Sequence, residues 1–325
     1  MKKQTKQEVK TILVTGCAGF IGSNFVKKFK DKYPKATVIG IDNLSTGRKE
    51  VIDKGIVFYK ISILDTKPLR EVFKKHRPEY VFHFAALPQV AYSVDHPKET
   101  TEVNLIGVIN LLEVSKEFKV KRFIFSSTAA VYGKASKLPI NETTTFPNPI
   151  SPYAIQKNSS EMFCRMYSEL FGLDTVCLRY FNVFGPGQYG GSAYATVISA
   201  WLESSFFPNS KKAYIEGDGS QTRDFCYVDN ITNGNILAME CSNNLKGEVI
   251  NLASGKKIAV KEAKKLIEKY SNKKLDLEKK PARLGDIKHS HADISKAKKL
   301  IGYKPTTGFS EGLEKTIAWY KERKY

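Results

Sequence analysis

Short apolar runs alternate with amphipathic segments along the first 181 residues of the chain. The apolar runs have the length of buried strands, and the segments between them carry apolar residues at helical spacing. Strands are expected at residues 11–15, 37–41, 56–61, 80–84, 122–125 and 175–181, and helices at residues 20–33, 65–75, 98–118 and 153–171. Because strands and helices alternate, the pattern predicts an α/β fold with a doubly wound parallel sheet.

The remainder of the chain has a less regular pattern. Helices are expected at residues 193–207, 229–241, 261–270, 294–302 and 310–324, a strand that could rejoin the sheet at 249–252, and loops at 185–192, 217–224 and 281–286. We expect residues 1–181 to form the parallel-sheet domain and residues of about 225–255 to return to it. Residues 182–325 should form mainly a smaller α/β domain that interleaves with the first.

The first expected strand runs directly into a glycine-rich turn, residues 16–22. Between a strand and a helix, such glycines let the backbone approach a pyrophosphate, and the helix N-terminus attracts its negative charge. Asp42 ends the second strand, 20 residues after Gly22. An acid at this place accepts hydrogen bonds from the adenosine ribose and repels a 2′-phosphate. The sequence therefore predicts a Rossmann domain that binds NAD in preference to NADP.

The helix expected from residue 153 carries a possible base. Ser151 suits the N-cap and Pro152 the first helical position, so Tyr153 and Lys157 should lie on one helix face. An unperturbed phenol titrates near ~10, and neighbouring cations can lower that pKa so that the phenolate acts as a base near neutrality. The spacing alone is weak evidence of catalysis. Two other segments strengthen the evidence. Ala85-Ala86 and residues 126–128 lie at the carboxyl ends of expected strands, and parallel sheets bind their ligands beyond these ends.

Composition narrows the class of protein. The chain has 325 residues, of which 42% are hydrophobic and 26% charged, as is usual for a globular protein. The net charge of +19 comes from lysines spread along the chain, which favours a basic surface over a nucleic-acid-binding site. Scattered cysteines and histidines indicate neither disulfides nor a metal site. With no signal peptide and no apolar run near the ~18 residues of a membrane span, we expect a cytoplasmic location and no membrane partner.

Several motifs occur in order from Thr11 to about Tyr320. They are Thr15-Gly16-x-x-Gly19-Phe20-Ile21-Gly22, Asp42-Asn43-Leu44-Ser45-Thr46-Gly47, Ser126-Ser127-Thr128 with Val131-Tyr132-Gly133, Tyr153-x-x-x-Lys157, Arg179-Tyr180-Phe181-Asn182, Gln221-Thr222-Arg223-Asp224-Phe225 and Arg283-x-Gly285-Asp286. In this order they resemble the extended short-chain dehydrogenase/reductases that modify nucleotide-activated sugars. The resemblance is closest to the UDP-hexose 4-epimerases, which implies an NAD-dependent isomerase of UDP-sugars.

The resemblance implies a reversible oxidation at C4 of the sugar. NAD⁺ stays bound and takes hydride from C4 while Tyr153 takes the proton of the 4-hydroxyl, and the hydride then returns to the other face of the 4-keto sugar. The implied catalytic residues are Thr128, which binds the 4-oxygen, Tyr153, and Lys157, which binds the nicotinamide ribose and lowers the pKa of Tyr153. The implied cofactor-binding residues are Gly16, Gly19, Phe20, Ile21, Gly22, Asp42, Asn43, Ser45, Gly47, Ile63, Ala85, Ala86, Asn104, Ser126, Tyr153, Lys157 and Phe181.

The same resemblance implies a UDP-sugar site and a dimer. The implied substrate-binding residues are Thr128, Asn182, Val197, Tyr214, Arg223, Arg283, Asp286 and Ser290. Arg223 and Arg283 would hold the diphosphate through their guanidinium groups. A homodimer would pair the helix that carries Asn104 and the helix that follows Tyr153 across a two-fold axis.

Two positions bear on the choice of sugar. Related 4,6-dehydratases and decarboxylases carry an acid soon after the position of Thr128, whereas Ala129 and Ala130 follow here, which favours plain epimerisation. Relatives that accept N-acetylated sugars have a small residue where Ser290 stands, so we expect UDP-GlcNAc and UDP-GalNAc as substrates, with or without UDP-Glc and UDP-Gal.

Three departures from the family pattern keep other substrates open. Ser62 replaces an acid near adenine, and residues 87–89 and 189–191 replace polar residues that border the sugar pocket in relatives. The alternatives are another nucleotide-sugar modifier, such as a UDP-glucuronate 4-epimerase or a reductase, and a non-catalytic NAD-binding protein.

Overall fold

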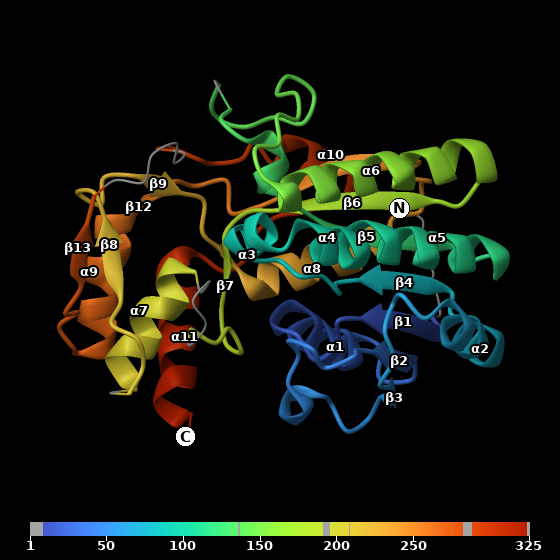
Figure 1. The fold of residues 1–325 in the computed structure, drawn as a ribbon, viewed down its shortest axis with the longest axis horizontal. Helices are drawn as coiled ribbons and strands as arrows, with labels where there is room; N and C mark the ends of the chain where they lie inside the picture. The colour runs from blue at the N-terminus through green and yellow to red at the C-terminus, as the bar shows by residue number, and fades with distance from the viewer. Residues whose placement is uncertain (1–8, 136, 191–195, 208, 282–287, 324–325) are drawn as a thin grey trace, which may run out of the picture.

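A seven-stranded parallel sheet forms the centre of the molecule (Figure 1). The structure is a computed structural model that describes residues 9–135, 137–190, 196–207, 209–281 and 288–323. The strand order is β11-β6-β5-β4-β1-β2-β3, which confirms the predicted doubly wound sheet. The strands are Thr11–Thr15 (β1), Thr37–Ile41 (β2), Val57–Tyr59 (β3), Tyr80–His83 (β4), Arg122–Thr128 (β5), Thr175–Tyr180 (β6) and Glu248–Leu252 (β11).

Helices cover both faces of this sheet because successive strand residues point to opposite sides. In β1, the side chains of Ile12 and Val14 pack into one core and that of Leu13 packs into the other. The first core is closed by α1 (Phe20–Lys32), α8 (Val228–Glu240) and α10 (Ser295–Ile301). The second is closed by α2 (Thr66–His76), α5 (Gly107–Glu117) and α6 (Pro152–Phe171).

The order of the strands reverses between β1 and β4. From β1 the chain moves outward through β2 and β3, and then returns to form β4, β5 and β6 on the other side. The carboxyl ends of β1 and β4 therefore flank a topological switch point, where doubly wound sheets bind their ligands. Thr15 and His83 end these two strands and are register partners.

A second group of elements lies beside the carboxyl ends of the sheet, on the left of Figure 1. Its own core contains Phe184, Trp201, Phe225, Ile267 and Leu313. Its helices are α7 (Val197–Phe206), α9 (Val260–Ser271) and α11 (Phe309–Glu322). Its short strands are Val183–Phe184 (β7), Tyr214–Glu216 (β8), Thr222–Arg223 (β9), Cys226–Tyr227 (β10), Ile258–Ala259 (β12) and Glu278–Lys280 (β13), which pair as β10-β7, β12-β9 and β13-β8.

Some elements differ from the sequence prediction. The single helix expected over residues 98–118 consists of α4 (Pro97–Thr101), a π-helical segment η2 (Glu102–Ile106) and α5. Helix α3 (Val90–Asp95) and strands β8, β12 and β13 were not predicted, and β9 lies inside a segment expected to be a loop. The 3₁₀ turns η1 (Lys49–Val51) and η3 (Ala129–Tyr132) complete the described elements.

Candidate active site

The glycine-rich turn brings the start of α1 close to the end of β4. Gly16 has a φ of +70°, and a Cβ there would lie 2.6 Å from the Ala85 nitrogen. The Gly19 amide donates to the Gly16 carbonyl at 3.0 Å, and a Cβ on Gly22 would collide with that same carbonyl. Only glycine meets these demands without displacement of the backbone.

The first turn of α1 follows this glycine turn and can bind an anion. Helix α1 begins with Phe20 and Ile21, and its N-cap, Gly19, makes no side-chain capping bond. The amides of the first turn have no intrahelical acceptor, and the helix dipole gives this end partial positive charge. The predicted residues of the turn therefore form a site suited to a pyrophosphate.

The carboxylate of Asp42 is buried at the end of β2 and holds the neighbouring loops. Its Oδ2 accepts a hydrogen bond from the Ala18 amide at 3.0 Å, and its Oδ1 accepts one from the Leu44 amide at 2.8 Å. The first bond links the carboxylate to the glycine-rich turn. Asp42 therefore lies beside the predicted pyrophosphate site, as a ribose ligand must.

The loop after Asp42 brings its predicted residues to the same place. The Asn43 side chain accepts a hydrogen bond from the Ser45 amide at 3.0 Å, which folds the loop back. A Cβ on Gly47 would lie 2.9 Å from Asp42 Oδ1, so the backbone passes against the carboxylate. Asn43, Ser45 and Gly47 thus lie in the loop beside Asp42, where we predict the adenosine ribose.

The carboxyl end of β4 lies across the switch point from the glycine turn. Ala85 and Ala86 are half-buried there. The Ala85 amide donates to Thr15 Oγ1 at 3.3 Å, and the same hydroxyl is 2.7 Å from His83 Nδ1. Burial and the nearby Lys157 hold the pKa of His83 well below its usual range, so its imidazole is neutral. Small side chains at Ala85 and Ala86 leave room for a ligand.

Asn104 lies in the π-helical segment and is fully buried. Its amide oxygen accepts from the Leu87 nitrogen at 2.8 Å, and its amide nitrogen donates to the Leu87 carbonyl at 3.0 Å and to Gln156 Oε1 at 2.9 Å. The Asn104 amide group therefore has its hydrogen-bonding partners within the protein. Through its two bonds to Leu87, it holds the loop that follows β4.

Thr128, Tyr153 and Lys157 come together where β5 meets α6. Ser151 caps α6 by accepting a hydrogen bond from the Ala154 amide at 3.2 Å, as predicted. Lys157 is buried, and its Nζ donates to the carbonyl of Ser126 at 2.9 Å. Tyr153 lies one turn earlier on the same helix face, and its hydroxyl shares a hydrogen bond with Thr128.

Burial dominates the electrostatics of this pair. It raises the pKa of Tyr153 to about 12, while the hydrogen bond with Thr128 acts in the opposite direction. Burial also lowers the pKa of Lys157 to about 8, against the influence of Cys164, Glu161 and Cys177. The protein groups alone therefore do not lower the pKa of Tyr153, and our prediction assigns that effect to Lys157 together with a second cation. A further cation beside the phenol would be needed to make it a base near neutrality.

Ile63 and Phe181 contribute their side chains to the protein interior. Ile63 is buried against α5, where a Cβ on Gly107 would lie 2.5 Å from its Cδ1. Phe181 is fully buried in a small cluster with Tyr132. The structure does not bring the Phe181 ring to the surface of the candidate site, although we predicted it as a cofactor contact.

The predicted substrate residues gather partly around Asp224. Asn182 is exposed, and its amide donates to the Asp224 carbonyl at 3.2 Å. Arg223 lies on β9, and its guanidinium donates to the Thr222 carbonyl at 3.0 Å. Ser290 is buried, and its amide donates to the same Thr222 carbonyl at 3.1 Å. Arg223 and Ser290 therefore flank one residue of β9.

Other predicted substrate residues lie elsewhere in the second group. Val197 is the first residue of α7 and is half-buried. Tyr214 lies on β8, where the Lys280 ammonium is 4.2 Å from its ring centroid. Arg283 and Asp286 lie outside the described residues.

Sequence reasoning missed two residues that support the site, Ser93 and Asp224. Ser93, on the unpredicted helix α3, accepts a hydrogen bond from the Tyr153 amide at 3.1 Å. The buried Asp224 carboxylate accepts from Ser254 at 2.8 Å and from the Gly255 and Ala292 amides at 3.0 and 3.2 Å. For Asp224, its place beside Arg223 in a motif was an available signal. For Ser93, no pattern in the sequence indicates the contact.

The fold and the site define a class of protein. A parallel sheet with an uncapped, glycine-bordered helix start, a buried acid after β2 and a tyrosine–lysine pair after β5 is a dinucleotide-dependent enzyme site. The model of the NAD dependent epimerase/dehydratase family matches residues 12–253. The chain belongs to this family, and NAD is the cofactor, as predicted.

Three of the similar proteins are named as UDP-sugar 4-epimerases. A UDP-glucuronate 4-epimerase from Thermodesulfobacterium geofontis is 35% identical over 321 residues, which cover 95% of this chain and 96% of that protein. The UDP-glucose 4-epimerase of Thermotoga maritima, solved with UDP-glucose, is 39% identical with a TM-score of 0.90 over 96% and 99% of the two chains. The UDP-N-acetylglucosamine 4-epimerase of Methanobrevibacter ruminantium, solved with UDP-N-acetylmuramic acid, is 38% identical with a TM-score of 0.88 over 97% and 99%.

Proposed function

We propose that this protein is a UDP-sugar 4-epimerase in which Tyr153 acts as the base. The observation that carries the proposal is the meeting of Thr128, Tyr153 and Lys157 beside the glycine-rich turn, in a chain whose compared relatives are UDP-sugar 4-epimerases. The intact set of three residues argues against a non-catalytic NAD-binding protein.

The residues present suit NAD as a resident cofactor. The first turn of α1 would hold its pyrophosphate, Asp42 its adenosine ribose, and Lys157 its nicotinamide ribose. When bound, NAD⁺ accepts a hydride from C4 of the sugar and later returns it. Residues 1–181, with the segment of about 225–255, would supply this site, and residues 182–325 would supply most of the UDP-sugar site.

The protein's own residues then move one proton. The Tyr153 phenolate accepts the proton of the sugar 4-hydroxyl and gives it back to the 4-oxygen when the 4-keto group is reduced. Thr128 donates a hydrogen bond to the 4-oxygen, and this bond stabilises the developing negative charge. The Lys157 ammonium and the positive ring of the oxidised cofactor together would lower the Tyr153 pKa from about 12 toward neutrality.

The nucleotide end of the substrate would provide most of the affinity, because the sugar must turn within its pocket. Asn182, Val197, Tyr214, Arg223, Arg283 and Asp286 are the proposed UDP-binding residues. The small side chain of Ser290 would leave space for an N-acetyl group, and UDP-GlcNAc and UDP-GalNAc are therefore the first proposed substrates. UDP-glucuronate is the second candidate, since it is the substrate in the printed name of one relative.

A cytoplasmic homodimer is the proposed assembly. Ile155 and Met162 of α6 and Ile106 of η2 expose large apolar side chains on adjacent helices, which is unfavourable unless a partner covers them. Among the described residues, no helix is long and apolar enough to cross a membrane. Light scattering of the purified protein tests the dimer directly.

The proposed function is tested with purified protein and no added NAD. UDP-GlcNAc, UDP-Glc and UDP-glucuronate are incubated separately, and the products are separated by chromatography. Formation of a 4-epimer from one of them establishes the activity, the sugar and the retention of the cofactor together. If none of the three gives an epimer, even with NAD⁺ supplied, the proposal is wrong.

A further inference from the structure

A third residue continues the helix face that carries the proposed catalytic pair. Tyr153, Lys157 and Glu161 follow one another at four-residue intervals along α6, so their side chains lie on successive turns of one side. All three are buried. Glu161 therefore lies one turn deeper in the protein than Lys157, beneath the proposed site.

The Glu161 carboxylate holds two neighbouring strands at once. The Arg179 guanidinium binds it with both arms, Nε to Oε1 at 2.9 Å and Nη2 to Oε2 at 2.6 Å. The Ser127 hydroxyl donates to the same Oε1. Ser127 of β5 and Arg179 of β6 are register partners, so one carboxylate joins α6 to adjacent positions of the sheet.

Ser127 links this carboxylate to the proposed catalytic groups. Its neighbour on one side, Ser126, offers the carbonyl that receives the Lys157 ammonium at 2.9 Å. Its neighbour on the other side, Thr128, shares the hydrogen bond with the Tyr153 hydroxyl. A shift of Ser127 relative to α6 would therefore move both contacts together.

Arg179 is itself fixed from its other side. Its guanidinium stacks 4.4 Å from the ring centroid of Tyr132, and the Tyr132 hydroxyl donates to Asn251 Oδ1 at 2.7 Å. Asn251 lies on β11 and is the register partner of Arg179. The side chains of Glu161 and Arg179 are each 4% exposed, so water does not screen the pair.

We propose that Glu161 and Arg179 are positioning residues whose buried ion pair fixes the end of β5 against α6 and keeps a negative charge beside the Lys157 ammonium. This inference rests on the proposed function of Tyr153 and Lys157. Neither residue touches the reacting atoms. Their contribution is to hold Thr128 and Lys157 in place and to keep Lys157 protonated.

The groups around Lys157 support the role of the charge. His83 faces it from β4, Cys177 from β6, and Cys164 and Glu161 from its own helix. His83 is neutral, and burial raises the pKa of Cys177 well above its usual range. Cys164, then the Glu161 carboxylate and then Cys177 oppose the effect of burial on the pKa of Lys157, and Glu161 is the carboxylate among them. Without the Glu161 carboxylate, the pKa of Lys157 would be lower still.

The test uses the holoenzyme and the pH dependence of turnover. Glu161→Gln keeps the shape and a hydrogen-bonding partner for Ser127 but removes the charge. Lys157 must be protonated to act, so turnover falls as the pH rises, and this fall is the alkaline limb of the pH profile. In Glu161→Gln the alkaline limb should move to lower pH by about one unit, so that at a given pH on the limb turnover is about tenfold lower than in the wild type. Ser127→Ala changes no charge, so turnover should fall at every pH while the alkaline limb stays in place.

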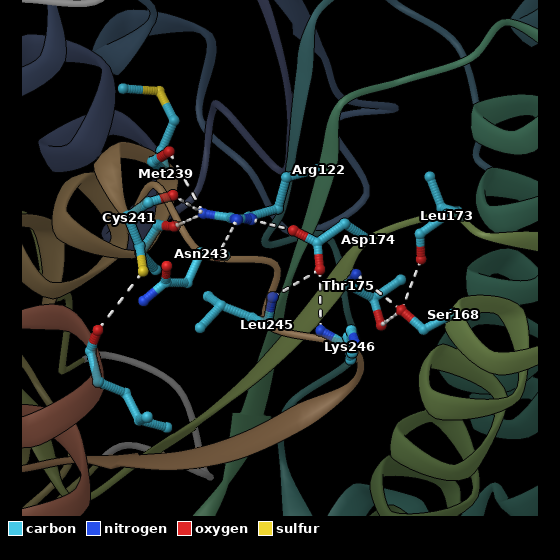
Figure 2. Close-up of polar contacts among 12 residues, drawn as sticks. Arg122, Ser168, Leu173, Asp174, Thr175, Met239, Cys241, Asn243, Leu245 and Lys246 are labelled. Atoms are coloured by element: carbon cyan, nitrogen blue, oxygen red, sulfur yellow. Dashed lines mark hydrogen bonds and ion pairs between the residues drawn. The ribbon is translucent and has the colours of Figure 1, made fainter.

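A buried ion pair at the opposite end of the sheet provides a matched control. Asp174→Asn removes one partner of the Arg122–Asp174 pair, shown in Figure 2, which is far from the proposed site along β5. It should lower stability without moving the alkaline limb. If Glu161→Gln does not fold, the double variant Glu161→Gln with Arg179→Met removes the ion pair as a whole. It must shift the alkaline limb in the same direction but by less, because the positive charge of Arg179 is lost together with the negative charge of Glu161.

The proposal is overturned if Glu161→Gln keeps the wild-type pH limb, if Asp174→Asn moves the limb as far, or if Ser127→Ala turns over at the wild-type rate. A second measurement separates this failure from failure of the proposed function. NAD⁺ affinity is measured by equilibrium dialysis between pH 6 and 9. Affinity should fall as the pH rises, and this fall should begin at a lower pH in Glu161→Gln than in the wild type. This holds even for a wild type that makes no epimer, and identical dialysis curves for the two proteins would refute the charge effect.

Discussion

The guanidinium of Arg48 stacks on the ring of Tyr189, 3.7 Å from its centroid. Arg48 directly follows Gly47 in the proposed adenosine loop, whereas Tyr189 lies in the segment between β7 and α7. The centroid of the Tyr189 ring also lies 4.7 Å from the Arg323 guanidinium and, in a T-shaped contact, 5.3 Å from the ring centroid of Trp319, and both residues lie near the end of α11. This contact joins the two groups of elements across the cofactor side of the molecule.

Replacement of Tyr189 with Ala should weaken retention of NAD. A cation–π contact of this kind contributes about 1 kcal/mol, and Arg48 would lose its support from the second group of elements. We expect bound NAD to dissociate about fivefold faster, as measured by its loss during gel filtration and its absorbance in the protein fraction. Tyr189→Phe keeps the ring and is the control, so equal loss of NAD from both variants would contradict the role of the contact.

Tyr153→Phe should retain bound NAD and lose epimerisation. The side chain is buried, and Phe fills the same space without the hydroxyl that accepts the proton. Turnover should fall by about 10²–10⁴, the usual contribution of a general base. Product formation and the NAD content of the purified variant are measured together.

A tyrosine at the far end of the same helix controls for effects on folding. The Tyr167 hydroxyl bonds to Glu113, away from the proposed site. Tyr167→Phe should therefore leave turnover unchanged. Wild-type activity in Tyr153→Phe would remove Tyr153 from the mechanism.

Ser290→Tyr should abolish turnover of N-acetylated sugars first. Ser290 is 9% exposed and lies beside β9, so a large ring there would take the space proposed for the acetamido group. Initial rates with UDP-GlcNAc and UDP-Glc are compared, with Ser290→Ala as the variant that keeps a small side chain. An equal loss of both activities in Ser290→Tyr would show that Ser290 does not select the sugar.

Local signals in the sequence were sufficient for the elements that build the cofactor side. The apolar run of β1, the glycine turn and the acid after β2 each indicate their structure without reference to distant residues. Helix α6 starts at the predicted cap, Ser151, and ends at Gly172, whose φ of 69° suits glycine. These features are encoded over a few neighbouring residues.

Contacts between distant residues determine what the sequence did not reveal. The π-helical segment accompanies bonds from Asn104 to Leu87 and Gln156, and no helical periodicity predicts such a distortion. Strand β13 is exposed and charged, and only its pairing with β8 makes it a strand. The Glu161–Arg179 pair also spans two elements, although the four-residue spacing from Lys157 to Glu161 offered a partial signal.

The Arg122–Asp174 pair should contribute strongly to stability and little to catalysis. Arg122 donates to Asp174 at 2.6 Å and also to the carbonyls of Ala238, Cys241 and Asn243 at 2.5, 2.9 and 2.7 Å, so it joins β5 to the end of α8 (Figure 2). Their side chains are 6% and 8% exposed. Asp174→Asn leaves a buried cation without its counter-ion.

The expected loss for Asp174→Asn is about 3 kcal/mol of the free energy of unfolding, measured by urea denaturation. The Asp174 carboxylate also accepts the Leu245 and Lys246 amides at 2.7 and 2.8 Å, and an asparagine oxygen can keep only part of this set. The control is Lys121→Ala, which removes the ion pair between Lys121 and Glu79. Because the Lys121 side chain is 52% exposed, this variant should lose less than about 1 kcal/mol of the free energy of unfolding. Similar losses in the two variants would mean that burial does not strengthen the Arg122–Asp174 pair.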